Sequence, residues 1–302
     1  MTIFEVSVPA TTANIGPGFD CLGAALSLYN HFEFSLADRL TITASGEGAD
    51  KVERDETNLV YQAIAKFYQH IDRPVPPIAF HTDTMIPLSR GLGSSATAIV
   101  GGIFGANLLA GSPLDRLELL DLAIAMEGHP DNVAPAMLGG CQLMASNQAG
   151  GWEYCDLNWH ESIGLVVAVP DFELSTAKAR EVLPEKFSMQ DAVFNASHLA
   201  LLSHGIQTGN VNWLKAGLQD RLHQNYRQSL IIGMAEVQAA AIAAGAYGLV
   251  ISGAGPTLLS LAPVGTIESV AQAMNQAWQA IGVNAVTKCL AIAKDGTTFK
   301  TR

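Results

Sequence analysis

The chain has 302 residues, about half of them apolar, so it can bury a sizeable core and is long enough for about two domains. Acidic residues outnumber basic ones by 28 to 17, and the net charge of -11 argues against nucleic acid or an anionic membrane as a partner. The four cysteines form no CxxC pair and no zinc spacing, which predicts reduced thiols in a cytoplasmic protein. The N-terminus lacks a basic signal-peptide region and the most apolar segment, 96–111, is too short for a bilayer, so no membrane segment is expected.

Patterns of apolar residues predict the elements of the first half of the chain. In chain order they are strands at 3–9, 32–36 and 40–44, a helix at 58–70, a strand at 78–82, helices at 95–110 and 113–126, and a strand at 139–145. The polar, glycine-containing stretch 150–161 is the best place for a domain boundary. We therefore expect one domain at 1–158 and a second at 159–302.

The second half opens with a continuous apolar run at 163–169, which is typical of a strand buried on both faces. Further elements follow in chain order: helices at 176–182, 189–208 and 226–244, strands at 248–251 and 257–261, a helix at 267–281 and a strand at 284–290. Each half of the chain therefore combines strands with helices.

Three glycine-rich loops, at 9–20, 87–96 and 252–257, each follow a strand-like segment, and we call them the first, second and third glycine turns. In the second turn, Gly91 and Gly93 permit backbone conformations closed to other residues and let a ligand approach closely. Ser94 and Ser95 then open a helix, and the free N–H groups of a helix N-terminus suit a phosphate. A serine hydroxyl there could also reach a phosphate-bound Mg²⁺. The alternative is a tight loop whose serine merely caps a helix.

Other phosphate-binding and catalytic signatures do not occur in the sequence. There is no GxxxxGK[ST], so the chain is not a P-loop protein, and no glycine turn completes the GxGxxG of dinucleotide-binding proteins. The protein-kinase HRD and DFG elements and the GxSxG of α/β-hydrolases are also missing.

The second glycine turn, with Gly-Leu-Gly-Ser-Ser-Ala ending at Ala96, resembles the phosphate loop of the GHMP kinases, which act on galactose, homoserine, mevalonate and phosphomevalonate. The first turn, PATTANIGPGFDCL, resembles the N-terminal motif of the homoserine kinases, and the third, GAGPT, resembles the C-terminal glycine motif of the superfamily. EGHPDNVAP at 127–135 and a Thr-x-x-x-Arg-x-x-Leu-Pro segment at 176–184 are similar to homoserine kinases too. Five motifs in the expected order span residues 9 to 257.

This resemblance implies the two-domain α+β fold of the GHMP kinases. The N-terminal domain is expected to resemble the second domain of ribosomal protein S5 and the C-terminal domain to be ferredoxin-like, with ATP between them. The activity implied is the ATP-dependent phosphorylation of the side-chain hydroxyl of L-homoserine to O-phospho-L-homoserine, in threonine biosynthesis. The implied partners are ATP, Mg²⁺ and L-homoserine, and a homodimer is possible.

The resemblance assigns ATP mainly to the second glycine turn. The expected ATP-binding residues are Asn58, Pro87, Arg90, Gly91, Leu92, Gly93, Ser94, Ser95, Ala96 and Thr97. Ser95 and Glu127 are expected to hold Mg²⁺, although a lone Glu at a helix end is often only a solvated charge. Gly253, Gly255 and Thr257 of the third turn would brace the acceptor and phosphate loops from the second domain.

The acceptor is a zwitterion, and its carboxylate suits the planar fork of arginine. By resemblance Arg180 and Arg227 take that role, with Arg221 as a competitor in the same segment as Arg227. Asp20 is expected to bind the ammonium group and Asn14 the hydroxyl or amine. The alternatives are surface charges for the arginines and turn chemistry for Asn14 and Asp20.

His129 and Asn132 are expected to line the acceptor site, and Thr176 to touch the reacting phosphate. Asn14, His129 and Thr176 are therefore the expected catalytic residues. No lysine occurs in the first glycine turn and Asp131 has no assigned role, so our hypothesis is that no single side chain acts as general base, since phosphoryl transfer has a loose transition state.

Three alternatives remain open at this point. The first is another GHMP kinase with a different small alcohol as substrate, and the second is a non-catalytic ligand-binding protein of the same fold. The third, a dinucleotide-binding protein, lacks its fingerprint. The third glycine turn reads Gly-Ala-Gly where Gly-Ser-Gly is common, which removes one possible hydroxyl contact.

Overall fold

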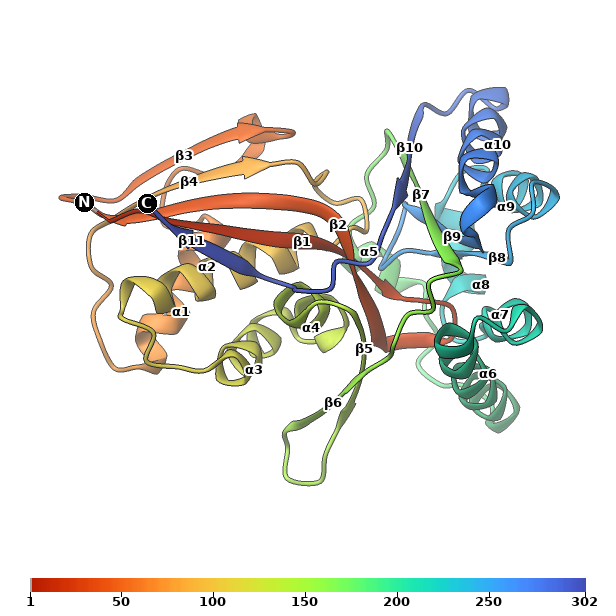
Figure 1. Cartoon of the computed structure of the whole chain (residues 1–302), viewed down its shortest axis with the longest axis horizontal. Coiled ribbons are helices and arrows are strands. Elements are labelled where there is room, and N and C mark those ends of the chain that lie inside the picture. Colours follow the sequence, from red (N-terminus) through yellow and green to blue (C-terminus); the bar gives the residue numbers. More distant parts are fainter. Residues whose placement is uncertain (1) are drawn as a thin grey trace.

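The computed structural model describes residues 2–302, which fold into two β-sheets with helices packed against them (Figure 1). The larger sheet has seven strands over these residues and contains the order β11-β1-β2-β4-β3, with β5 beside β2 and β6 beside β5. β3 and β4 pair in parallel, and the other pairs are antiparallel. The strands are β1 (Phe4–Asn14), β2 (Gly18–Leu36), β3 (Thr41–Gly46), β4 (Ile78–Thr84), β5 (Cys141–Ser146), β6 (Trp152–Asp156) and β11 (Thr298–Thr301).

Four helices lie against one face of the larger sheet and form the first lobe with it (Figure 1). They are α1 (Leu59–His70), α2 (Ser94–Leu109), α3 (Arg116–Glu127) and α4 (Pro130–Leu138). The glycines of α2 let the helix touch the sheet directly. A Cβ on Gly101 would lie 2.7 Å from the ring of Phe32, and one on Gly105 would lie 2.4 Å from the ring of Phe34. These glycines therefore serve helix–sheet packing.

The smaller sheet, ordered β10-β7-β9-β8 and antiparallel throughout, forms the second lobe with the remaining helices. Its strands are β7 (Ile163–Pro170), β8 (Gly248–Ile251), β9 (Leu258–Pro263) and β10 (Ala285–Leu290). Its helices are α5 (Thr176–Glu181), α6 (Met189–Thr208), α7 (Val211–Gly217), α8 (Gln224–Arg227), α9 (Met234–Ala243) and α10 (Ile267–Ala280). Short 3-10 turns lie at Ala49–Lys51, Gln228–Leu230 and Val264–Thr266. Every residue of β7 is buried, as its apolar run predicts.

The two lobes share a hydrophobic core. One face of the smaller sheet packs against α9 and α10. The other face contributes Leu165 and Val167 of β7 to a buried cluster that also contains Leu22 and Leu26 of β2 and Leu214 of α7. Because side chains of both lobes fill one core, the relative position of the lobes is set by packing.

The predicted strands and helices are confirmed in type at most positions, but the first glycine turn differs. The sequence predicts a loop at 9–20, whereas the structure has a long β1–β2 hairpin whose tip is at 15–17. Backbone pairing continues almost to the tip, from Pro9 opposite Tyr29 to Asn14 opposite Gly18. Glycine and proline indicate a turn correctly, but they do not show how little of the segment turns.

Several other elements depart from the sequence prediction. The single helix expected at 226–244 is split into α8 and α9, because Gly233 adopts a left-handed φ of 74° at the start of α9. Helices α4 and α7 and strands β6 and β11 are not predicted. α4 contains Pro135, which argues against a helix interior, and the two strands are short, largely exposed edges without a clear alternation.

The end of the chain returns to the first lobe, where β11 pairs with β1 (Figure 1). The expected boundary at 158/159 falls between β6 and β7 and stays a prediction, since the last strand lies in the first sheet. Strands and helices combine in both lobes, so the α+β class is confirmed. Over residues 2–302, none of the helices has both the length and the apolar character that a bilayer span needs.

The shared core predicts a large stability cost for truncating Leu26. We expect Leu26→Ala to lower the free energy of unfolding by about 2–5 kcal/mol, because it removes a fully buried side chain from the junction of the lobes. Leu36→Ala, at the exposed end of the same strand, is the matched control and should cost less than about 0.5 kcal/mol. Urea denaturation measures both changes, and equal losses would contradict a shared core.

Candidate active site

A cavity of about 450 Å³ is lined by residues of both lobes. All three glycine turns reach it, together with the starts of α1, α2 and α5 and the end of α3. The expected site residues that line it are Asn14, Asp20, Asn58, Arg90, Gly91, Gly93, Ser94, Ser95, Glu127, His129, Asn132, Thr176, Arg180, Arg227, Gly253 and Gly255. The expected residues that lie outside its lining are Pro87, Leu92, Ala96, Thr97 and Thr257.

The second glycine turn brings the N-terminus of α2 to the cavity. Gly93 is the N-cap of α2 with a left-handed φ of 70°, and Gly91 has a φ of 79°. No side chain of the described residues caps this end of the helix, so its first N–H groups are available to a ligand. Ser94 and Ser95 follow as the first helical residues and both line the cavity. This end of the site can therefore bind a phosphate group.

Backbone atoms of the three glycine turns bond directly to one another. The amide of Gly253 in the third turn donates to the carbonyl of Ala13 in the first at 2.9 Å. The hydroxyl of Ser252 lies 2.8 Å from that of Thr12 and 2.6 Å from the carbonyl of Gly91, so it links all three turns. A Cβ on Gly91 would lie 2.3 Å from the Ser252 carbonyl oxygen, which leaves no space for a side chain. The cavity is thus framed by hydrogen bonds among the three turns, made by backbone groups and by the hydroxyl of Ser252.

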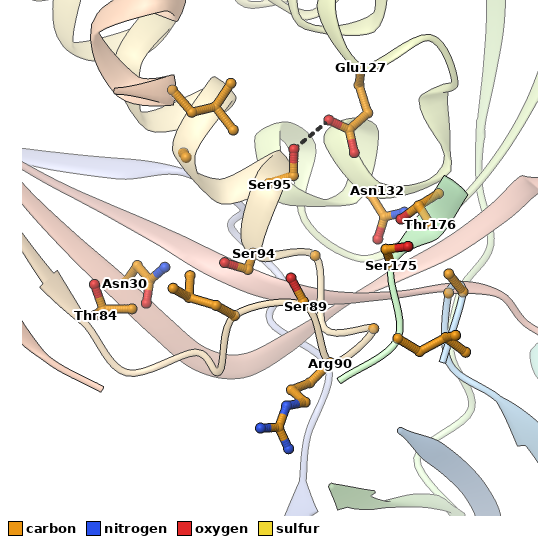
Figure 2. A pocket seen from close by; sticks show the side chains of 18 of the residues that line it. Asn30, Thr84, Ser89, Arg90, Ser94, Ser95, Glu127, Asn132, Ser175 and Thr176 are labelled. Atoms are coloured by element: carbon orange, nitrogen blue, oxygen red, sulfur yellow. Dashed lines mark hydrogen bonds between the residues drawn. The ribbon is translucent and has the colours of Figure 1, made fainter. Parts of the chain in front are cut away.

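Ser95 and Glu127 form one end of the site (Figure 2). The Ser95 hydroxyl donates to Oε2 of Glu127 at 2.9 Å, and Glu127 is the last residue of α3. Burial raises the pKa of Glu127, as does the charge of Asp131, while Ser95 and His129 oppose the shift. A partly buried carboxylate with a raised pKa gains from a nearby cation. Two oxygen donors of this kind fit a Mg²⁺ ion.

Arg90 does not contribute its charge to this end of the site. Figure 2 shows its side chain pointing away from Ser94 and Ser95. Its guanidinium donates to the carbonyl of Pro170 and lies 3.9 Å from the carboxylate of Glu173. Arg90 therefore joins the second turn to the second lobe, and its expected contact with ATP stays a prediction that its backbone could still fulfil.

Asp20 and Arg180 are paired with each other across the other end of the cavity. Two parallel hydrogen bonds, of 3.0 and 2.7 Å, join the Arg180 guanidinium to both oxygens of Asp20. Arg227 lies nearby and is almost fully buried. Burial lowers the pKa of Arg227 to about 10, with a further contribution from the charge of Arg180, so it remains positive at neutral pH. This end of the site therefore holds two cations and one anion.

His129 is paired with Asp131, to which the sequence assigns no role. Nδ1 of His129 lies 2.5 Å from Oδ1 of Asp131, whose side chain is buried. Burial alone would lower the pKa of His129, but Asp131, Glu127 and Asp20 outweigh that effect and raise it. Polar atoms of Asp20, His129 and Asp131 all lie within 4.8 Å of one another. A proton on His129 thus offsets part of the negative charge of these carboxylates.

Several polar residues of the expected site use their side chains for structure. Asn14, with a left-handed φ of 64°, accepts from the amide of Asp20 at 2.8 Å and donates to the carbonyl of Gly253 at 2.9 Å. Asn58 caps α1, and Asn132 accepts from the Thr11 hydroxyl. These bonds fix the shape of the cavity, and contacts of the same residues with a substrate stay predictions.

The hydroxyls of Thr97 and Thr176, two of the expected threonines, differ in their surroundings. Thr97 is buried, and its hydroxyl donates to the carbonyl of Ser94 and accepts from the side-chain amide of Asn30. The side-chain oxygen of Asn30 in turn accepts from the two backbone amides that follow β4. Thr176 opens α5 and lines the cavity, as does the preceding cap residue, Ser175.

Sequence reasoning missed Phe19, His223 and Asp131. The ring of Phe19 lies beneath the guanidinium groups of Arg180 and Arg227, at 5.5 and 5.1 Å from its centroid, and stacks on His223 at 5.3 Å. The one signal for His223 is its position four residues before Arg227, which places both on one face of a helical turn. Nothing in the spacing singles out Phe19.

Comparison with known proteins agrees with this geometry. The family model described as "GHMP kinases N terminal domain" matches residues 58–140, and "GHMP kinases C terminal" matches residues 202–280. The fold, the second glycine turn and these two matches define the chain as a GHMP kinase, a class of enzyme that uses ATP.

Full-length relatives narrow the assignment. A homoserine kinase of Microchaete diplosiphon is 57% identical over 295 residues, which cover 97% of this chain and 96% of that protein. One of Trichormus variabilis is 56% identical over 97% of both chains. The crystal structure of homoserine kinase from Cytophaga hutchinsonii has a TM-score of 0.90 and 28% identity, covering 99% of this chain and 97% of its own. The chain belongs to the homoserine kinase family.

The contact between the glycine turns predicts that Gly91 tolerates no side chain. We expect Gly91→Ala to lower the melting temperature and weaken ATP binding, because the new Cβ would meet the Ser252 carbonyl and the left-handed backbone costs about 1 kcal/mol more. Gly150→Ala is the control, since it has a φ of 85° and open space around its Cβ. Calorimetry measures the melting temperature and the ATP affinity of both variants. Equal losses of stability and unchanged ATP affinity in both variants would contradict the prediction.

The pairing of His129 with Asp131 predicts a pH dependence. With a raised pKa in the folded state, His129 stabilises the fold below its ordinary pKa of about 6.5, and this contribution is lost as the pH rises through the raised value. Asp131→Asn removes the main cause that raises the pKa of His129, while burial and the charges of Glu127 and Asp20 remain, so this pKa should fall. Side-chain NMR titration measures this shift. An unchanged His129 pKa would show that Asp131 does not control it.

Proposed function

We propose that the chain transfers the γ-phosphoryl group of ATP to the side-chain hydroxyl of L-homoserine and releases ADP and O-phospho-L-homoserine. The observation that carries the proposal is one cavity with two chemically different ends. One end offers the N-terminus of α2 to a phosphate, and the other offers two arginines and an aspartate to a zwitterion. The relatives named homoserine kinase support the same acceptor.

The nucleotide is proposed to bind with its phosphates on the second glycine turn. Free N–H groups at the start of α2 meet negative oxygens, and Gly91 and Gly93 leave room for a close approach. The cavity continues past Asn30 and Thr84 toward the start of α1, where Asn58 and Val60 line it. This part is proposed for the adenine side of ATP.

The acceptor is proposed to bind where Arg180 and Asp20 are paired. A zwitterion brings a carboxylate for the arginines and an ammonium group for Asp20. It can therefore take the place of the Arg180–Asp20 ion pair and leave neither of these two charges without a partner. Arg227 supplies the additional positive charge. His129, Asn132 and Thr176 line the space between this end and the second glycine turn, where hydroxyl and phosphate have to meet.

Ser95 and Glu127 are proposed to hold the Mg²⁺ that accompanies ATP, because both present oxygen atoms to the cavity and the carboxylate is only partly exposed. The ion would neutralise charge on the phosphate oxygens when bound. The contribution of the chain itself is to keep the two oxygen donors together at the end of α3 and the start of α2.

Among residues 2–302, each titratable side chain near the proposed acceptor hydroxyl is already engaged by another group. His129 is held by Asp131, and its raised pKa favours the protonated imidazole, which cannot accept a proton. Asp20 is engaged with Arg180. These pairings favour transfer that depends on positioning and charge stabilisation, without a dedicated base. A cytoplasmic location and a homodimer stay predictions.

Turnover of a small panel of alcohols tests the proposed function. In a coupled ADP-release assay we expect selective turnover of L-homoserine over L-threonine, L-serine, mevalonate and galactose, and none without Mg²⁺. Arg180→Ala should raise the KM for homoserine at least about tenfold, because it removes a charged partner of the substrate and leaves Asp20 unpaired.

Arg221→Ala is the matched control. Its guanidinium lies 3.9 Å from the centroid of the Phe194 ring and 3.6 Å from Asp191, and Arg221 does not line the cavity. Its KM values should stay within about twofold of the wild type, a range typical of surface substitutions. Turnover of mevalonate or galactose in place of homoserine would refute the acceptor, and ATP binding without any turnover would refute the activity.

A further inference from the structure

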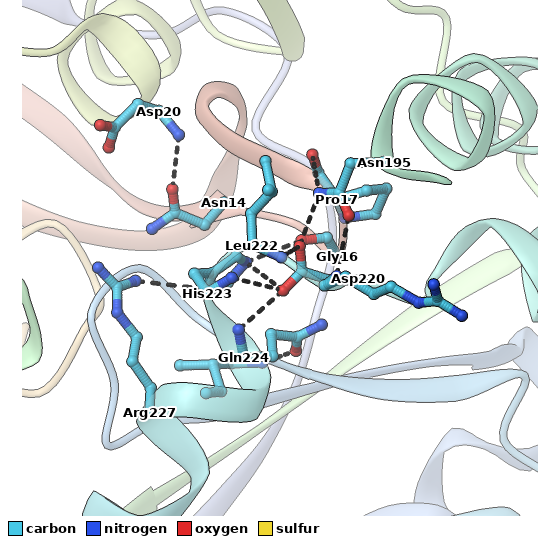
Figure 3. A network of polar contacts seen from close by, with 12 residues as sticks. Asn14, Gly16, Pro17, Asp20, Asn195, Asp220, Leu222, His223, Gln224 and Arg227 are labelled. Atoms are coloured by element: carbon cyan, nitrogen blue, oxygen red, sulfur yellow. Dashed lines mark hydrogen bonds and ion pairs between the residues drawn. The ribbon is translucent and has the colours of Figure 1, made fainter. Parts of the chain in front are cut away.

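Arg227 and Arg180 differ in how the fold holds them, although both face the acceptor end. Arg180 is neutralised by Asp20. Arg227 is held by three neutral acceptors, the carbonyl of Ala179 at 2.9 Å, the carbonyl of Gly253 at 3.2 Å and Nδ1 of His223 at 3.4 Å. Figure 3 shows the contact with His223. Within residues 2–302 Arg227 has no carboxylate at salt-bridge distance, and its Nη2 makes no hydrogen bond. Its full charge is therefore directed to the cavity.

The two ring nitrogens of His223 meet groups of opposite kind, which fixes the imidazole in one form. Nε2 lies 2.8 Å from the carbonyl oxygen of Gly16, which can only accept, so Nε2 carries the hydrogen. Nδ1 faces an N–H of Arg227, which can only donate, so Nδ1 must present its lone pair. A proton on Nδ1 would replace this hydrogen bond with two opposed N–H groups. The contacts thus require the neutral Nε2–H tautomer.

Asp220 holds the segment that carries His223. Its carboxylate accepts four hydrogen bonds, from the backbone amides of Leu222, His223 and Gln224 and from the side chain of Asn195, at 2.7–3.0 Å. Four donors occupy both oxygens, and the nearer one lies 3.7 Å from Nε2 of His223, beyond hydrogen-bond range. Asp220 therefore fixes the start of α8 and does not take the proton that Gly16 binds.

We propose that His223 is a positioning residue, held as the neutral Nε2–H tautomer between Gly16 and Arg227, which orients the Arg227 guanidinium toward the carboxylate of the acceptor without neutralising it. A carboxylate at this place would hold Arg227 as firmly but would cancel its charge, and a charged imidazole would repel it. The charged groups that face His223 are Asp220 and Arg227, and Phe19 covers its ring. This inference rests on the proposed acceptor.

Two substitutions of His223 separate its two contacts. Asparagine places its amide near the position of Nδ1 and can accept from Arg227, but it does not reach Gly16. Glutamine reaches toward the position of Nε2 and can donate to Gly16, but it offers Arg227 no acceptor. If His223 served only the stability of the fold, the change in the KM for homoserine would follow the change in melting temperature in both variants.

We expect His223→Gln to raise the KM for homoserine about tenfold, the effect of losing one hydrogen bond to a charged group, with the KM for ATP within about twofold of the wild type. His223→Asn should restore most of the homoserine KM even where its melting temperature is lower. Ser260→Ala, which removes another buried hydrogen bond of the second lobe, should change stability and neither KM. Parallel increases of both KM values, or an unchanged homoserine KM in both His223 variants, would overturn the proposal.

Side-chain ¹⁵N NMR of the wild-type chain tests the tautomer without relying on activity. We expect His223 to show a protonated Nε2 and an unprotonated Nδ1 from about pH 6 to about pH 9. A hydrogen on Nδ1, or titration of the ring in this range, would overturn the assignment even if the variants do not fold. A wild type that shows this tautomer but does not phosphorylate homoserine would instead refute the proposed function alone.

Discussion

The hydrogen bonds among the three glycine turns are the constraint on which the site depends. Gly253 bonds to Ala13, and the Ser252 hydroxyl bonds to Gly91, so segments 161 to 240 residues apart are joined. These contacts leave no space for a side chain at Gly91. They place the start of α2 opposite the acceptor end. The core shared by the two lobes includes residues of these turns, such as Ile15 and Leu92, and so helps to hold the turns in place. The two ends of the cavity are therefore set by the fold before any substrate binds.

Charge is distributed in a way that an excess of acidic residues does not suggest. The chain carries a net charge of -11 and is proposed to bind two substrates that both carry anionic groups. The solution lies in a few placed groups: backbone N–H donors at the start of α2, the pair of Arg180 with Asp20, and Arg227 held by neutral acceptors. Because a buried charge acts more strongly than an exposed one, few cations are sufficient.

Motif residues proved to be of two kinds. Ser95, Glu127, Arg180 and Arg227 present their functional groups to the cavity, as the sequence motifs suggest. The polar groups of others form hydrogen bonds within the fold, as the hydroxyl of Thr97 in α2 does. Both kinds look alike in a sequence, because a recurring polar residue in a turn can serve a ligand or the turn itself. Side-chain partners are needed to tell them apart.

Local periodicity is enough to predict β7, α1 and α10, and the order of the motifs is enough to predict a phosphate site and an acceptor site. Both depend on spacing and turn chemistry, which are properties of a few neighbouring residues. Tertiary structure alone decided that Asp20 neutralises Arg180 across 160 residues and that His223 connects Arg227 to Gly16 at the tip of the first hairpin. It also returned β11 to the first sheet. Such pairings depend on how distant segments pack, and no local pattern records that.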